Sequence, residues 1–113
     1  MIDNPDQVDR LVPKLKVSLP LFASLTSRVA ESLREQSPGL EVTERCAVTR
    51  IDYAGDEGGI MCWVDLRSRD DSQVFIVSIT HLTFDRRQPL AREIAAYQKH
   101  RINRIRRSDG WLM

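Results

Sequence analysis

The hydrophobic positions at both ends of the chain repeat with a helical period, whereas those in the middle alternate as in strands. Asn4 and Pro5 suit the N-cap and the first position of a helix. The apolar stripe that follows is Val8, Leu11, Val12 and Leu15. Because Pro13 lacks an amide and clashes with the preceding turn, we expect the first helix to end or kink near Val12.

A second helix is predicted to begin at Pro20. Its apolar stripe is Phe22, Leu25, Val29 and Leu33. The sequence Ser37-Pro38-Gly39 is expected to end it.

Residues 40–53, 60–66 and 74–84 are rich in β-branched residues and predict three strands. Turn-forming residues at 54–59 and a polar loop at 67–72 separate them, and loops this short favour an antiparallel meander. Closing the first hairpin at Asp56-Glu57 pairs residues on the two strands. These pairs are Ile51 with Cys62, Tyr53 with Ile60, and Arg50 with Trp63. The apolar set changes phase between Val48 and Ile51, which predicts a bulge there.

A last helix is predicted from Pro89 to Arg107, ended by 108–110. The fold class is therefore α+β, in the order α-α-β-β-β-α. A single domain, 1–113, would hold a three-stranded antiparallel meander, two N-terminal helices and one C-terminal basic helix. The third strand is apolar on both sides, so both faces of the sheet need cover, from the three helices or from a second subunit.

The charge is distributed unevenly along the chain. Residues 86–113 carry eight bases and two acids, a formal charge of +6, although the whole chain carries only +1. The remainder is therefore acidic, at −5. This asymmetry indicates either a polyanionic partner or an acidic protein surface.

The composition and the first residues of the chain indicate the cellular compartment in which we expect the protein. A hydrophobic content of 42% and a charged content of 29% are those of a globular protein, and no apolar run approaches the roughly 18 residues that span a bilayer. Residues 1–6 lack the apolar core of a secretory signal. We therefore expect a cytoplasmic protein whose cysteines, Cys46 and Cys62, are free thiols in strands.

The residues that could support catalysis do not form a recognisable set. Cys46, Cys62, His81 and His100 lack the close pairing of zinc ligands, and no serine or cysteine is paired with a histidine. The two carboxylates of Asp56-Glu57 are interpreted as part of a hairpin turn. We expect no catalytic residue, no metal, no cofactor and no small-molecule substrate.

Two families resemble the chain in outline. The order of helix, three strands and basic helix is similar to a double-stranded-RNA-binding domain, but residues 54–59 read AGDEGG where that family has Gly-Pro-x-His, and the lysine-rich helix start is absent. The strands 59–63 and 74–79 resemble the paired strands of the PD-(D/E)xK nuclease core. Its metal-binding carboxylates and lysine would fall on Met61, Val77 and Ile79, which implies a catalytically inactive relative.

The last helix has an apolar arc and a basic face. Arg101 falls within the apolar arc, so its stem must snorkel or its head must find a carboxylate. The candidate polyanion-binding residues are Lys99, Arg101, Arg104, Arg106 and Arg107.

Three hypotheses follow. The first is a non-enzymatic binding or assembly module, cytosolic and homodimeric. Its candidate interface residues are Trp63, Trp111, Leu112 and Met113. The second is a sequence-nonspecific nucleic-acid-binding protein that uses the basic last helix. The third is the inactive relative of a nuclease-like core.

Overall fold

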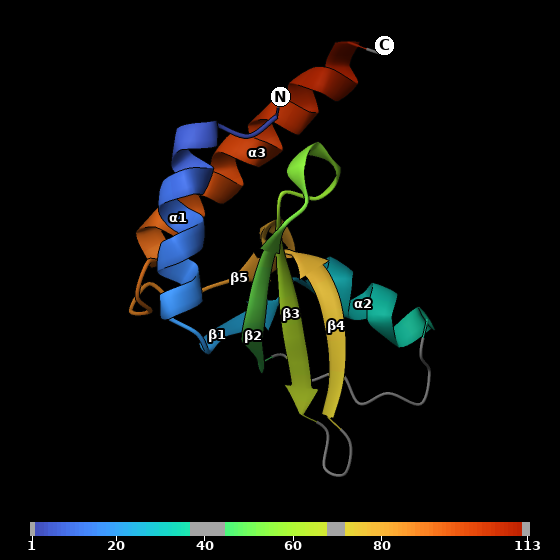
Figure 1. The fold of residues 1–113 in the computed structure, drawn as a ribbon. Coiled ribbons are helices and arrows are strands. Elements are labelled where there is room, and N and C mark those ends of the chain that lie inside the picture. The colour runs from blue at the N-terminus through green and yellow to red at the C-terminus, as the bar shows by residue number, and fades with distance from the viewer. Residues whose placement is uncertain (1, 37–44, 68–71, 112–113) are drawn as a thin grey trace.

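The computed structural model describes residues 2–36, 45–67 and 72–111, which form three α-helices and a five-stranded antiparallel sheet (Figure 1). The elements are, in chain order, α1 (Pro5–Val17), β1 (Leu21–Leu25), α2 (Ser27–Gln36), β2 (Arg45–Tyr53), β3 (Ile60–Arg67), β4 (Ser72–Ser78), β5 (Leu82–Thr83) and α3 (Ala91–Trp111). The α+β class is confirmed, while the sheet is larger than the expected meander.

The strand order across the sheet is β4-β3-β2-β1-β5. The strands β2, β3 and β4 form the predicted meander. The pairing of β2 with β3 is the one that the turn predicts, with Ile51 opposite Cys62 and Arg50 opposite Trp63. The pairing also shifts between Val48 and Arg50, so the predicted bulge is confirmed.

The prediction of a helix beginning at Pro20 is wrong, because residues 21–25 form strand β1. Leu21 and Leu25 are buried and Phe22 is exposed, which is the alternation of a strand with one covered face. The helix begins only at Ser27. The segment satisfies both periods over five residues, and pairing of β1 with β2 and β5 selects the strand.

The expected strand over 74–84 is also divided in two. Strand β4 ends at Ser78, whose hydroxyl accepts a hydrogen bond from the backbone N–H of Thr80 at the start of a short 3-10 turn, Ile79–His81. The chain then crosses to the far edge of the sheet, where β5 pairs with β1.

Two helix boundaries differ from expectation. Helix α1 continues through the exposed Pro13 to Val17. Helix α3 begins at Ala91 rather than Pro89, because Leu90 has a φ of 66°, and it continues to Trp111. No helix in the described part of the chain is long and apolar enough to cross a membrane.

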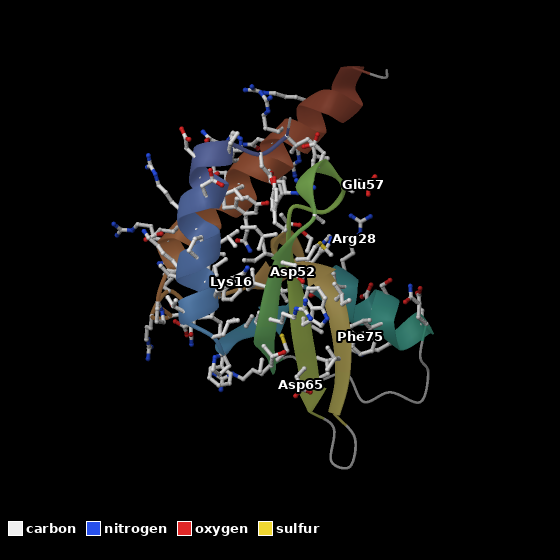
Figure 2. All side chains as sticks on the ribbon, viewed as in Figure 1. Lys16, Arg28, Asp52, Glu57, Asp65 and Phe75 are labelled. Atoms are coloured by element: carbon white, nitrogen blue, oxygen red, sulfur yellow. The ribbon has the colours of Figure 1, made fainter. Side chains whose placement is uncertain are left out.

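All three helices contribute to one hydrophobic core on the inner face of the sheet, which we define as the face that carries Cys62, Val64 and Leu66. The helical residues buried there are Val8, Leu11 and Leu15 of α1, Ala30 and Leu33 of α2, and Ile94 and Tyr97 of α3. Phe75 of β4 packs against this core, and Figure 2 shows its side chain between β4 and α2. An ion pair of 3.2 Å between Lys14 and Glu93 joins α1 to α3.

The opposite face, here called the outer face, retains exposed apolar side chains. Its cross-strand neighbours are Phe22, Ala47, Asp65 and Val74 in one row, and Arg50, Trp63 and Ile76 in the next. Phe22 is 59% exposed, and Val74 and Ile76 are each 54% exposed. We expected both faces of the sheet to need cover. In the described structure the helices cover the inner face, and the outer face keeps exposed apolar side chains.

Candidate functional site

A buried polar cluster fixes α3 against the N-terminal segment and the turn between β2 and β3. The Asp3 and Arg101 residues are only 2% and 4% exposed, and Nη1 of Arg101 donates to Oδ1 of Asp3 at 3.0 Å. Nη2 of the same guanidinium donates to the backbone carbonyl of Asp56 at 2.9 Å. Arg101 thus has the carboxylate that its position in the apolar arc requires.

Two tyrosines complete the cluster. The hydroxyls of Tyr53 and Tyr97 both donate to Oδ2 of Asp3, at 3.0 and 2.7 Å. The Tyr97 oxygen also accepts the backbone N–H of Ile60 at 3.0 Å. Burial, and then the hydrogen bond to Asp3, raise the pKa of Tyr53 to about 12, and the same two causes raise the pKa of Tyr97.

Gly59 allows this close approach. Its φ of 69° favours glycine, and a side chain there would collide with the Tyr97 hydroxyl and reach within 2.9 Å of Nε of Arg101. The glycine that the sequence assigns to the turn therefore serves the packing of α3 as well.

The burial of Arg101 changes the candidate basic surface. Its guanidinium faces Asp3, so Arg101 is not part of the solvent-exposed basic set. The other four predicted bases are exposed on α3: Lys99, Arg104, Arg106 and Arg107. Figure 1 shows the C-terminal end of α3 running beyond the other elements. We call these four residues the basic set.

Of the four predicted interface residues, the structure describes the side chain of Trp63 alone. Trp63 lies on the outer face beside Ile76, whereas Leu112, Met113 and the side chain of Trp111 lie outside the described residues. The guanidinium of Arg50 stacks 4.7 Å from the centre of the Trp63 ring and also pairs with Asp52 at 3.2 Å. We define Trp63, Val74 and Ile76 as the outer patch.

Charge flanks the outer patch. Figure 2 shows Asp52 and Asp65 towards opposite ends of the β2–β3 hairpin. Asp65 is the neighbour of Val74 across the β3–β4 pair, and its Oδ1 atom is buried without a hydrogen-bond partner in the described structure. The outer patch is therefore apolar at the β4 side of the sheet, with acidic neighbours.

The two edges of the sheet are built differently, a feature that sequence reasoning missed. The short strand β5 is capped by Gln98 of α3, whose Nε2 donates to the carbonyls of Ile79 and Leu82 at 2.7 and 2.8 Å. At the other edge, β4 runs for seven residues, and no strand of the described structure pairs with its outer side. No charged residue or proline interrupts β4.

A hollow of about 460 Å³ lies between β5 and α3. Leu82, Phe84 and Ile94 supply apolar walls, with Arg86 and Arg92 beside them. Among the described residues that line it there is no carboxylate, cysteine or histidine.

The two thiols are buried and unreactive at neutral pH. Desolvation raises the pKa of Cys46 to about 11 and the pKa of Cys62 to about 12. The Cys46 thiol donates to the carbonyl of Ala23 at 3.4 Å, and both cysteines are free. Within the described residues, no three His, Cys, Asp or Glu side chains gather as metal ligands would.

Comparison of the chain with protein-family models, with curated proteins and with solved structures finds no match. The features of the described residues that bear on function are the outer patch, the unpaired edge of β4 and the basic set.

Proposed function

We propose that the chain is a non-enzymatic assembly module that forms a homodimer through the outer patch, in a reducing compartment such as the cytoplasm. The observation that carries this proposal is the pair of neighbouring aliphatic residues Val74 and Ile76, each 54% exposed on a sheet face that the helices leave bare. A contiguous exposed apolar surface usually marks an interface.

The small size of the outer patch limits the free energy that its burial can contribute to dimerisation. Burying a half-exposed aliphatic side chain contributes about 1 kcal/mol, so Val74 and Ile76 of two copies supply about 4 kcal/mol together. Association itself costs about 4 kcal/mol or more in lost translational and rotational freedom, so burial of these side chains alone does not hold a dimer together. A dimer that is populated at micromolar concentration must therefore add further contacts, such as backbone pairing.

Sedimentation velocity over a concentration series tests the proposal. We expect wild-type protein to dimerise with rising concentration, and Ile76→Lys to weaken the dimer about tenfold or more, because it places a charge in the interface. Val17→Lys is the matched control, since Val17 is 85% exposed on α1, away from the outer patch, and should dimerise like wild type. A wild-type protein that stays monomeric at every concentration refutes the proposal.

A second candidate function is nonspecific binding of nucleic acid by the basic set. It is favoured by the exposure of four of the five predicted bases on α3, three of which, Arg104, Arg106 and Arg107, lie in its C-terminal half. These residues are not accompanied by a described aromatic side chain on the same face, which favours phosphate contact over base reading. The acidic remainder of the chain opposes such binding and keeps it weak.

Fluorescence anisotropy with a labelled duplex separates this candidate from the first. Four phosphate contacts predict that the logarithm of affinity falls with the logarithm of salt with a slope of roughly −3.6. Arg104→Ala/Arg106→Ala/Arg107→Ala should abolish most binding. Arg10→Ala/Arg86→Ala/Arg87→Ala removes the same charge elsewhere and is the control. Absence of binding at low salt, or equal losses in both variants, argues against a site on α3.

A further inference from the structure

We infer that the homodimer forms by antiparallel pairing of β4 with the β4 of a second copy, which joins two five-stranded sheets into one continuous sheet. This inference rests on the proposed self-association and specifies its geometry. It is carried by the contrast between the two edges of the sheet.

The two edges of the sheet differ in how they are protected from pairing with another strand. Natural sheets guard their edges with short strands, charged residues, proline or a covering element. The β5 edge has such a guard, because it is two residues long and Gln98 binds the carbonyls of Ile79 and Leu82. The β4 edge has seven residues without charge or proline. Within the described residues, one edge is closed by the chain itself, and no strand pairs with the other.

The sequence of β4 favours a second copy of the same chain as the strand that pairs with its outer side. The sequence of β4, SQVFIVS, has a serine at each end and an apolar segment at 74–77. An antiparallel copy can therefore bring the central apolar residues, Val74, Phe75 and Ile76, against the same residues of the partner strand. Pairing of a strand with itself about a twofold axis is the self-complementary arrangement that a homodimer requires.

The two faces of the sheet set the register of this pairing. Directly opposite residues of an antiparallel pair lie on the same face, so the two outer faces continue into each other only in certain registers. Centring the axis on Phe75 pairs all seven residues of β4 and places Val74 opposite Ile76 of the second copy. Both outer patches then meet at the seam, and Phe75 lies on the inner face, where it already contacts the core.

Site-directed disulfide formation tests this register. We propose to mix Val74→Cys protein with Ile76→Cys protein under mild oxidation, because cross-strand neighbours place their Cβ atoms within disulfide range. The mixed sample should cross-link several-fold faster than either variant alone. Wild-type protein is the control for the native thiols, since Cys46 and Cys62 are buried.

A second variant distinguishes edge pairing from packing of one outer face on another. Phe22 lies on β1, three strands from β4, so Phe22→Cys should not cross-link in the edge-paired dimer. If the protein dimerises but cross-links through Phe22→Cys and not between Val74→Cys and Ile76→Cys, the edge geometry is wrong. The proposed self-association is then still supported. A protein that sediments as a monomer at all concentrations overturns both.

Amide hydrogen exchange tests the pairing of β4 independently of cross-linking. Backbone N–H groups on the free side of β4 should become protected as the protein is concentrated, whereas those of β2, a central strand, should not change. Concentration-independent exchange in β4, measured where sedimentation shows a dimer, contradicts pairing at this edge.

Discussion

At the scale of single residues, the carboxylate of Asp3 joins the N-terminal segment to β2 and α3. It accepts three hydrogen bonds, from Tyr53, Tyr97 and Arg101, and its side chain is fully shielded from solvent. A buried ion pair adds little to stability compared with apolar residues of the same shape, but removing one partner leaves the other charge unpaired.

We therefore predict that Asp3→Asn lowers the free energy of unfolding by about 3 kcal/mol, because it strands the buried guanidinium of Arg101. Urea denaturation measures the effect. Asp9→Asn is the control, since Asp9 is exposed on α1 and should change stability by about 0.5 kcal/mol or less. Equal stability of the two variants would mean that the pair is not buried in solution.

The sequence predicts that Arg101 needs a special environment, but it does not predict that Asp3 provides it. The place of Arg101 in an apolar arc indicates that a carboxylate or snorkelling is needed, because a buried guanidinium cannot remain unpaired. The identity of that carboxylate is not predictable from local pattern, since Asp3 lies 98 residues away. The same ambiguity led to the inclusion of Arg101 in the candidate polyanion surface, from which its burial removes it.

At the scale of elements, the hairpin of β2 and β3 was predictable, whereas strand β1 and the separate strand β5 were not. A turn of known length fixes which residues face each other, so the pairing of Ile51 with Cys62 follows from the sequence. Strand β1 has only five residues, in which helical and strand periods both fit. The break at Ser78 has neither glycine nor proline to mark it. The free edge depends on the strand order, which local patterns do not contain.

We predict that Gln98→Leu weakens the β5 edge. The change removes the donor to the carbonyls of Ile79 and Leu82, and a buried acceptor left unpaired costs about 1–3 kcal/mol. Urea denaturation gives the loss, and faster amide exchange in β1 would locate it. Gln36→Leu, on the exposed end of α2, is the control. A loss no larger than that of the control would contradict a role for Gln98 as an edge cap.

At the scale of the whole molecule, the buried thiols and the buried Tyr97 hydroxyl make the stability of the fold decrease at alkaline pH. Burial raises the pKa of Cys46 to about 11 and of Cys62 to about 12, and it also raises the pKa of Tyr97. The unfolded chain therefore loses these protons at lower pH than the folded chain does. The stabilisation is complete below the ordinary thiol pKa and is lost as the pH rises through the folded values.

We predict that the urea midpoint is highest below about pH 8.5 and falls steadily towards pH 11, with the thiols acting first. The Cys62→Val variant should show a smaller fall, because it removes one of the groups and keeps the volume nearly constant. A midpoint that is constant or rises between pH 9 and about 11 would show that the thiols are accessible to solvent in the folded chain.

The length of chain enclosed between Asp3 and Arg101 also bears on how the molecule folds. Closing the long loop between Asp3 and Arg101 costs more chain entropy than closing a local turn, so we expect this contact to form after the hairpins. A contact that is absent from the transition state affects the rate of unfolding and leaves the rate of folding nearly unchanged. The first few residues of the chain would then determine how long the native state lasts rather than how quickly it is reached.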